Sequence, residues 1–246
     1  MKRKFRPASW SLLLPAILCL AGCLSCGKSR ANQPAVPSGT LQFQGSQYSY
    51  AVFVPSAYDH VHALPAILLV HGGGGNGPDF LKIWQDFAET NGIILVAPTL
   101  PLSAALETQV PQLFPALMEL VKTQWLLDSR RIYLFGYSAG GYSTFDAAML
   151  DSTYFAAAGV FAAIITPDYY WIVQKAQRKI PITMYIGDHD QFFSLAQTRA
   201  TRDLLLSMGF TVHYVEIAKQ DHNYPAIARW VNPDVWTFMS QYSLPQ

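Results

Sequence analysis

The sequence predicts one α/β domain in which strands alternate with helices around a mostly parallel sheet. Short, nearly continuous apolar runs recur along the chain, as expected of strands that are buried on both faces of such a sheet. The longer stretches between these runs carry apolar residues at helical spacing. Strands that alternate with helices imply right-handed crossovers, and hence a central sheet of about eight strands with helices on both faces.

The first part of the domain is expected to form a hairpin at the edge of the sheet, followed by a buried strand. Residues 40–44 and 48–54 have the composition of two short strands, and Gly45 lies in the turn between them. Residues 65–71, PAILLVH, form an apolar run of the length of one buried strand. A helix is predicted for residues 78–91, because apolar side chains recur there at helical spacing.

A second buried strand and a long helix are expected next. Residues 93–97 are apolar, and Pro98 ends this strand. From about residue 105 to residue 127 the apolar positions form a helical stripe. Pro111 and Pro115 belong to the first turns of this helix or kink it, because proline lacks the N–H that a helix interior needs.

The second half of the domain continues the alternation around the segment RIYLFGYSAGG, residues 131–141. Its apolar strand ends in a glycine-flanked turn, after which a helix can begin. The remaining elements are a helix at 140–150, a strand at 156–162, a helical segment at 168–179, a strand at 182–186, a helix at 193–208, a strand at 211–217 and a helix at 234–242.

The N-terminus has the layout of a secretory signal. Lys2, Arg3, Lys4 and Arg6 precede an apolar run at residues 10–20. That run is shorter than the roughly 20 apolar residues of a membrane-spanning helix. The pattern therefore predicts an exported protein and no membrane span at this end.

The residues after the apolar run resemble the lipobox of bacterial lipoproteins, because the letters LAGC end at Cys23. In that family the signal is removed before the cysteine, which carries lipid on its sulfur. The resemblance implies a signal peptide at residues 1–22, a lipidated tether at 23–39 and the α/β domain at 40–246. Leu24 stands where aspartate is the inner-membrane retention signal, so the implied location is the cell envelope, at the outer membrane of a Gram-negative host. An ordinary signal peptide with cleavage nearby is the alternative.

Composition argues against several classes of function. The cysteines are Cys19, Cys23 and Cys26, so the predicted domain must be stable without internal disulfides. Loss of residues 1–22 removes four basic residues and no acidic one, which changes the net charge from +1 to −3 and gives no basis for nucleic acid binding. There is no dinucleotide fingerprint, and the acidic residues beside His189 lack the spacing of known metal sites. We therefore expect no cofactor and no metal.

A serine in the turn at the centre of the chain is the first candidate for chemistry. Gly136-Tyr137-Ser138-Ala139-Gly140 matches G-x-S-x-G, in which a sharp turn between strand and helix exposes the serine hydroxyl. Glycine suits positions 136 and 140, because a Cβ there would collide with a neighbouring strand or helix. A glycine-rich turn that happens to contain serine is the alternative.

The loop after the strand at 65–71 is the second candidate. His71 is followed by four glycines, residues 72–75, and then by Asn76. Consecutive glycines let backbone N–H groups approach a ligand closely, and such donors can stabilise an oxyanion. The alternative is a flexible loop without a catalytic role.

Two later strand ends carry the acid and the base that a serine nucleophile needs. Serine is a poor nucleophile unless an adjacent base takes its proton. Asp188 and Asp190 follow one strand, and one of them could cap the next helix while the other orients a histidine. Asp168 is a further candidate for the acid. His222 is the candidate base, because it lies in the loop after the last strand whereas His213 lies inside that strand.

Together these residues resemble the α/β-hydrolases, and the resemblance extends from about residue 40 to the end of the chain. The sequence is most similar to small serine esterases grouped with polyhydroxybutyrate depolymerases and with feruloyl and acetylxylan esterases. The likeness rests on YAVFVP at residues 50–55, His71-Gly72-Gly73, GYSAGG at residues 136–141, Gly187 with an acid three residues later, and a late histidine.

The resemblance implies that Ser138 is the nucleophile, Asp190 the acid and His222 the base, with the N–H groups of Gly73 and Ala139 as the oxyanion hole. The implied reaction is acyl transfer through an acyl-enzyme that water then hydrolyses. Depolymerases of this group often carry a cysteine at the position of Gly73, so polymer hydrolysis is not implied.

The expected partners are a small ester or an acylated saccharide, and a membrane through lipid on Cys23. Phe192, Phe193, Tyr137 and Trp171 are candidates for the substrate pocket, although such aromatic residues also occur as helix core. The acyl and alcohol parts of the substrate, and the oligomeric state, stay open at this level.

Two other functions also stay open. A peptidase of the prolyl-oligopeptidase type shares G-x-S-x-G-G, although the chain has no room for the propeller of that family. A non-catalytic envelope binding protein of the same fold is the other alternative. It would have no need for three matched residues in the order serine, aspartate, histidine.

Overall fold

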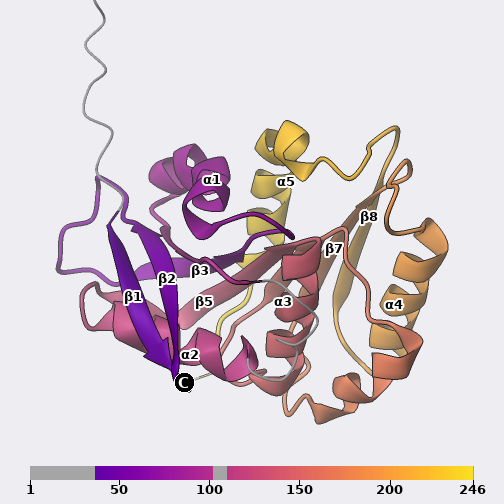
Figure 1. Ribbon diagram of the computed structural model, residues 1–246, viewed down its shortest axis with the longest axis horizontal. Helices are drawn as coiled ribbons and strands as arrows, with labels where there is room; N and C mark the ends of the chain where they lie inside the picture. The colour runs from indigo at the N-terminus through magenta and orange to yellow at the C-terminus, as the bar shows by residue number, and fades with distance from the viewer. Residues whose placement is uncertain (1–36, 102–109, 246) are drawn as a thin grey trace, which may run out of the picture. The chain divides into compact units, whose positions relative to one another are not determined.

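The computed structural model describes residues 37–101 and 110–245. The predicted signal peptide, Cys23 and most of the predicted tether lie outside these residues (Figure 1). None of the helices in the described part of the chain combines the length and the apolar character needed to cross a membrane.

The described residues form one sheet of eight strands in the order β1-β2-β4-β3-β5-β6-β7-β8. Strand β2 pairs antiparallel with β1 and β4, whereas β4, β3, β5, β6, β7 and β8 are parallel to one another. The strands are β1 (Ser38–Phe43), β2 (Ser46–Phe53), β3 (Leu64–Val70), β4 (Ile94–Pro98), β5 (Leu127–Tyr137), β6 (Ala158–Phe161), β7 (Ile182–Gly187) and β8 (Val212–Ile217). The predicted mostly parallel α/β sheet is confirmed.

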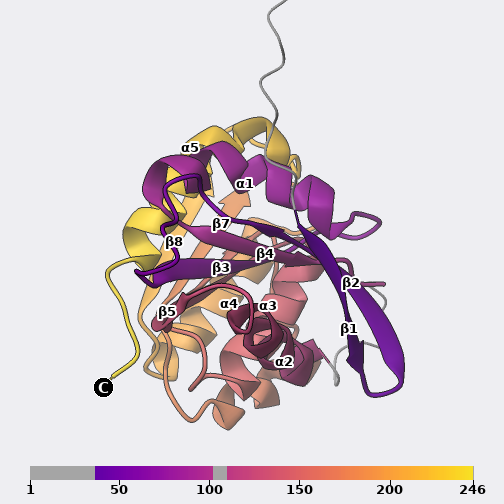
Figure 2. The same ribbon diagram turned by 90° about the vertical axis from the view of Figure 1, so that its left-hand side faces the viewer.

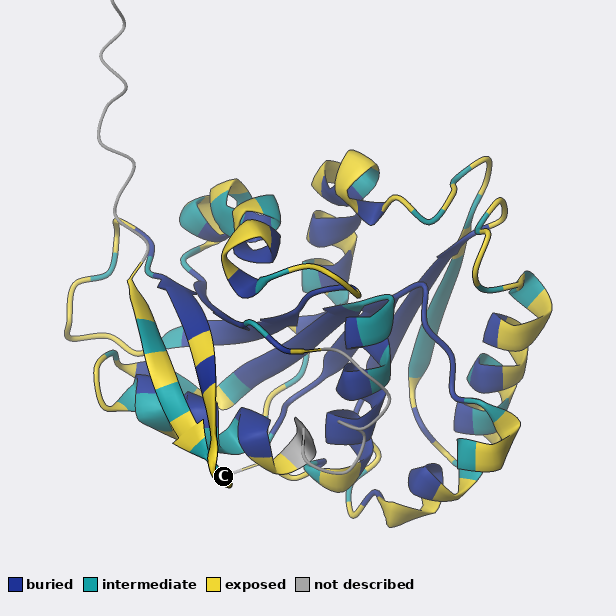
Figure 3. Cartoon of the chain, in the orientation of Figure 1, coloured by how far each residue is buried: buried dark blue, intermediate teal, exposed yellow. Residues whose placement is uncertain are grey.

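Helices cover both faces of the sheet, because the central strands are apolar on both sides. Figure 2 shows α1 and α5 above the sheet and α2, α3 and α4 below it. The helices are α1 (Gly77–Asn91), α2 (Val110–Lys122), α3 (Ala139–Leu150), the 3₁₀ helix η2 (Pro167–Lys175), α4 (Leu195–Ser207) and α5 (Tyr224–Met239). All residues of β4, β6 and β7 are buried, and Figure 3 shows the buried strands at the centre and the more exposed β1 at the edge.

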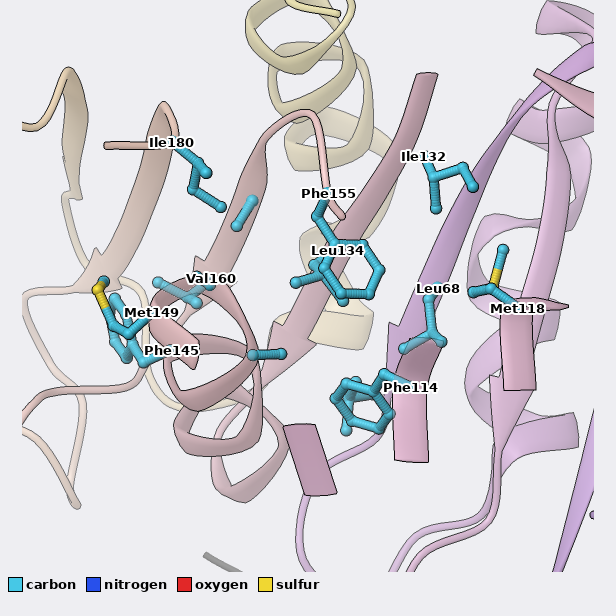
Figure 4. Close-up of a cluster of buried hydrophobic side chains, with 14 of the residues drawn as sticks. Leu68, Phe114, Met118, Ile132, Leu134, Phe145, Met149, Phe155, Val160 and Ile180 are labelled. Carbon is cyan, nitrogen blue, oxygen red and sulfur yellow. The ribbon is translucent and has the colours of Figure 1, made fainter. Parts of the chain in front are cut away.

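Two apolar clusters hold these layers together. On one face Leu68 of β3 and Leu134 of β5 belong to the same cluster as Phe114 of α2 and Phe145 of α3 (Figure 4). On the other face the fully buried Trp84 of α1 belongs to a cluster with side chains of α5. Close packing on both faces makes the strands a rigid support for the loops that follow them.

The register of the sheet brings several loops to the same edge. Val70 pairs with Gly136, and Gly187 pairs with Ile217, so β3, β5, β7 and β8 end side by side in neighbouring pairs. The four loops that the sequence analysis singled out begin at these strand ends. In a parallel sheet this carboxyl edge is where ligands bind.

Four elements differ from the sequence prediction. Helix α2 ends at Lys122 and not near residue 127, because Leu127 already pairs with β3 as the first residue of β5. Helix α5 begins at Tyr224 and not at residue 234, because Pro225 fits the first turn, where its missing N–H costs nothing, and Pro233 is tolerated inside the helix. Strand β5 begins at Leu127, five residues before Ile132, where the apolar run begins, because pairing with β3 continues beyond a shift in register. The predicted segment 168–179 forms η2, a 3₁₀ helix.

Candidate active site

Ser138, His222 and Asp190 are joined by two hydrogen bonds at the carboxyl edge of the sheet. The Nε2 atom of His222 lies 2.8 Å from Oγ of Ser138, and its Nδ1 atom lies 2.7 Å from Oδ2 of Asp190. Ser138 follows β5, Asp190 follows β7 and His222 follows β8. With a proton on Nδ1 donated to the carboxylate, Nε2 can accept a hydrogen bond from the serine hydroxyl.

The backbone at Ser138 is strained, with φ 54° and ψ −121°. Its N–H donates to the carbonyl of Phe161 at 2.9 Å, which ties the turn to β6. A Cβ on Gly136 would lie 2.2 Å from Oγ1 of Thr144, and a Cβ on Gly140 would lie 2.2 Å from the carbonyl oxygen of Val70. Glycine on both sides therefore lets the helix come close enough to the sheet for the serine to sit at the apex.

The geometry distinguishes between the two aspartates that follow β7. The side chain of Asp190 is fully buried, and besides His222 it accepts hydrogen bonds on Oδ1 from the N–H groups of Phe192 and Phe193, both at 2.9 Å. Asp188 instead accepts from the N–H of Lys219 at 2.6 Å and so ties the acid loop to the loop that carries His222. Asp190 is the aspartate held against the imidazole.

The glycine loop after β3 is held by the ring of His71, which is buried. The N–H of Leu100 donates to Nε2 at 3.0 Å, so the proton of the ring is on Nδ1, which donates to the carbonyl of Gly72 at 2.7 Å. Burial lowers the pKa of His71, which keeps the ring neutral. Gly73 faces the residue after the serine, since a Cβ on Gly73 would lie 3.7 Å from Cβ of Ala139.

Aromatic rings surround the imidazole of His222. The rings of Phe192, Tyr137 and Phe193 have their centroids 4.7, 5.1 and 5.8 Å from it. Phe192 is 70% exposed and therefore faces solvent beside the site. Trp171 is not part of this group: it is half exposed and contacts Tyr169 of η2 with ring centroids 5.1 Å apart.

Two cavities lie beside these residues. One of about 290 Å³ is lined by the glycine loop, by Tyr137 and by side chains of α1 that include Phe80. The other, of about 200 Å³, is lined by residues of α3, of the segment after β6 and of η2, including Tyr142 and Asp168. Tyr142 connects this second cavity to the site, because its ring centroid lies 5.9 Å from that of Phe193. Asp168, considered as an acid from the sequence, thus lines a cavity and is not part of the hydrogen-bonded chain to His222.

Metal ligands are not gathered in the described part of the chain. No group of three or more histidine, cysteine, aspartate or glutamate side chains there is arranged to hold an ion. His189 reaches Asp188 only at 3.9 Å, and its side chain is 67% exposed.

No protein-family model matches the chain. The sequence is 27% identical over 165 residues to the bifunctional acetylxylan esterase/xylanase of Neocallimastix patriciarum, a match that covers 63% of this chain and 23% of that protein. A thermostable esterase of known structure superposes with a TM-score of 0.65 and 21% identity, over 85% of this chain and 63% of the other. A ferulic acid esterase from Anaeromyces mucronatus superposes with a TM-score of 0.69 and 14% identity, over 84% and 90%.

The chain has the α/β-hydrolase fold. The likeness to acetylxylan and feruloyl esterases that was expected from the sequence is confirmed by these matches. The chain spans about a quarter of the curated relative and about two thirds of the thermostable esterase. In this fold the turn that carries Ser138 joins β5 to α3.

Two hydrogen bonds near the site had no signal in the sequence. One runs from the N–H of Leu100 to Nε2 of His71 and sets the tautomer of that ring. The other runs from the hydroxyl of Tyr137 to the backbone carbonyl of His222, at 2.8 Å. Each joins residues that are far apart in the chain, so neither spacing nor composition could indicate it.

Proposed function

We propose that this protein is a serine hydrolase that cleaves carboxylic esters through an acyl-enzyme. The observation that carries the proposal is the pair of hydrogen bonds by which His222 joins Ser138 to a fully buried carboxylate on Asp190. An imidazole held between a hydroxyl and a carboxylate is the arrangement that activates serine as a nucleophile.

In the proposed reaction Oγ of Ser138 attacks the ester carbonyl while Nε2 of His222 takes the hydroxyl proton. The carbonyl oxygen becomes an oxyanion that accepts hydrogen bonds from the N–H groups of Gly73 and Ala139. Each such donor is worth about 3 kcal/mol of the barrier. The proton then moves from His222 to the leaving alkoxide, which departs as the alcohol. Water, activated in the same way, releases the acid and restores the serine.

Asp190 acts on the imidazole and not on the substrate. Its Oδ2 atom accepts a hydrogen bond from the Nδ1–H of His222, while the two backbone donors on Oδ1 prevent the carboxylate from turning away. This arrangement keeps His222 in the tautomer that can accept the serine proton, and it stabilises the imidazolium that forms during the reaction.

We propose a small ester or an acylated saccharide as the substrate. The name of the curated relative includes acetylxylan, and the structure of the Anaeromyces esterase contains ferulic acid. Cavities of about 200 and 290 Å³ beside the site suit small groups. Polar lining residues such as Asp168 offer acceptors for the hydroxyl groups of a saccharide.

We further propose that lipid on Cys23 anchors the enzyme in a bacterial cell envelope, with residues 1–22 as the signal peptide, 23–39 as the tether and 40–246 as the catalytic domain. The support is the lipobox resemblance at residues 20–23. Expression in a bacterial host with labelled palmitate tests it. Wild type should carry label and partition into detergent, and Cys23→Ala should do neither; label in both proteins would refute an anchor at this residue.

Hydrolysis of p-nitrophenyl acetate by the full-length protein, with Ser138→Ala as the matched variant, tests the esterase proposal. We expect turnover by wild type, loss of turnover in the variant, and covalent labelling of Ser138 by a fluorophosphonate probe. Peptidyl p-nitroanilides serve as the comparison substrates. Equal turnover of the ester by Ser138→Ala, or faster turnover of the anilides than of the ester by wild type, would reject the proposal.

A further inference from the structure

Tyr137, the last residue of β5, contacts three segments of the candidate active site. Its ring centroid lies 5.1 Å from that of His222. On another side the ring lies against the glycine loop, since a Cβ on Gly72 would come within 3.0 Å of two of its carbons. Ser138 follows it directly in the chain. One side chain therefore touches the base loop and the glycine loop and borders the strained turn.

The hydroxyl of Tyr137 forms a hydrogen bond within the protein. It donates to the backbone carbonyl of His222 at 2.8 Å, and the same carbonyl accepts the N–H of Tyr224 at 2.9 Å. The ring of Tyr137 packs against Tyr224 and Phe161, with centroids 5.6 and 6.1 Å away. Because the ring is wedged among buried aromatic side chains, the position of the hydroxyl is set by the core and not by the loop.

We propose that Tyr137 is a positioning residue that fixes the backbone of His222 relative to Ser138 through this hydrogen bond. The inference rests on the proposed function. Asp190 holds the imidazole at Nδ1, and Tyr137 holds the carbonyl of the same residue, so His222 is fixed at both ends. A base held in this way keeps Nε2 at 2.8 Å from Oγ of Ser138, and a small displacement of a catalytic group costs much of the rate.

The donor persists across the pH range in which esters are assayed. Burial, together with the charges of Asp190 and Asp221, raises the pKa of Tyr137 to about 12. The phenol therefore stays protonated and donates to the carbonyl of His222 throughout that range. The hydroxyl of Tyr137 is not available to donate to a substrate, because it already donates to the backbone carbonyl of His222.

Tyr133 provides a matched control on the same strand. Its hydroxyl donates to a backbone carbonyl, that of Tyr242, at 2.9 Å, and burial raises its pKa to about 12. It lies four residues before Tyr137, toward the opposite end of β5 from Ser138. Tyr133→Phe removes the same kind of hydrogen bond without touching the base loop.

The experiment compares Tyr137→Phe and Tyr133→Phe in the full-length protein in detergent, with active sites titrated. For Tyr137→Phe we expect kcat for p-nitrophenyl acetate to fall about tenfold with KM within about twofold of wild type, and fluorophosphonate labelling to slow by a similar factor. Tyr133→Phe should keep the wild-type kcat. Both variants should lose a similar amount of thermal stability, because each loses one part-buried hydrogen bond from a tyrosine hydroxyl to a backbone carbonyl.

Proton NMR of the Nδ1 proton of His222 adds a readout that does not require turnover. The resonance is assigned by its absence in His222→Gln, and we expect it to broaden or shift in Tyr137→Phe only. The inference would be overturned if Tyr137→Phe kept the wild-type kcat and labelling rate, or if kcat fell equally in Tyr137→Phe and Tyr133→Phe. If wild type neither hydrolyses esters nor takes the label, the proposed function fails. The resonance then decides the positioning role by itself, and an unchanged signal in Tyr137→Phe rejects it.

Discussion

His71 accepts a hydrogen bond from the backbone N–H of Leu100 at 3.0 Å, and this contact determines how the glycine loop is held. Because Nε2 is occupied as an acceptor, the ring proton is on Nδ1 and is donated to the carbonyl of Gly72. That carbonyl therefore faces the imidazole, and the N–H of Gly73, which belongs to the same trans peptide, points in the opposite direction. The histidine of the His-Gly-Gly segment thus supports the loop and does not act on a substrate directly.

Replacement of His71 by alanine should therefore impair the proposed oxyanion hole. We expect kcat for p-nitrophenyl acetate to fall at least about tenfold with a smaller change in KM, since one oxyanion donor is worth about two to three orders of magnitude. Steady-state kinetics on titrated enzyme provide the measurement. A wild-type kcat in His71→Ala would show that the loop holds its shape without the ring.

The same histidine predicts a pH dependence of stability. Burial lowers the pKa of His71 in the folded protein below its ordinary value of about 6.5. The neutral ring therefore stabilises the fold above that value, and this stability is lost as the pH falls. The difference in unfolding free energy between wild type and His71→Ala should shrink between pH 7.5 and pH 5 in urea denaturation. A constant difference would contradict the buried, neutral ring.

Asp151, the residue that ends α3, should behave in the opposite way. Burial raises its pKa to about 6, and Oδ2 has no hydrogen-bond partner among the described residues. Its charged form is penalised in the fold, so its contribution to stability is present below the unfolded pKa of about 4 and is lost as the pH rises through about 6.

Asp151→Asn should consequently stabilise the protein at pH 8 by about 1 kcal/mol, after allowance for solvent screening of a partly exposed group. The gain should vanish near pH 3, below both pKa values, where the aspartate is mostly protonated in both states. Urea denaturation at the two pH values measures it. An equal gain at both would mean that charge is not the cause.

Two glycines of the site should respond differently to alanine. Gly140→Ala places a Cβ 2.2 Å from the carbonyl oxygen of Val70, so the helix cannot approach β3 and the serine turn should be lost. Gly73→Ala meets only Cβ of Ala139, at 3.7 Å, which is an ordinary contact, and it keeps its N–H. We expect Gly140→Ala to be destabilised and unlabelled by the fluorophosphonate, and Gly73→Ala to fold and react. A labelled, stable Gly140→Ala together with an unlabelled or unfolded Gly73→Ala would show that the steric argument is wrong.

Phe192 should influence which esters are accepted. Its ring lies edge-on to His222 with centroids 4.7 Å apart and is 70% exposed, whereas its N–H holds Asp190. Phe192→Ala removes the ring and keeps that N–H. We expect kcat/KM to fall about fivefold or more for p-nitrophenyl butyrate and less for the acetate, because a longer acyl chain buries more apolar surface against the ring. Equal losses on both esters would assign the ring to support of the imidazole alone.

The alternation of strands and helices was predictable because each element is encoded locally. An apolar run such as ILVAP in β4 can be buried on both faces of a sheet, and this property does not depend on distant residues. Boundaries were less predictable. Tyr224 begins α5 because it is buried among Phe80, Tyr137 and Phe161 below the His222 loop, and such tertiary packing leaves no periodic signal at a helix start.

By itself the sequence determined the parallel α/β architecture, the glycine-flanked turn at Ser138 and the strand ends at which an acid and a histidine occur. These are local patterns, set by steric and apolar constraints within a few residues of one another. The resemblance to serine esterases implied Asp190 as the acid, whereas only the tertiary structure decided that the proton of His71 is on Nδ1 and that the hydroxyl of Tyr137 binds the carbonyl of His222. Each of these depends on hydrogen bonds between different loops, whose direction is set by the sheet register that brings the loops to one edge.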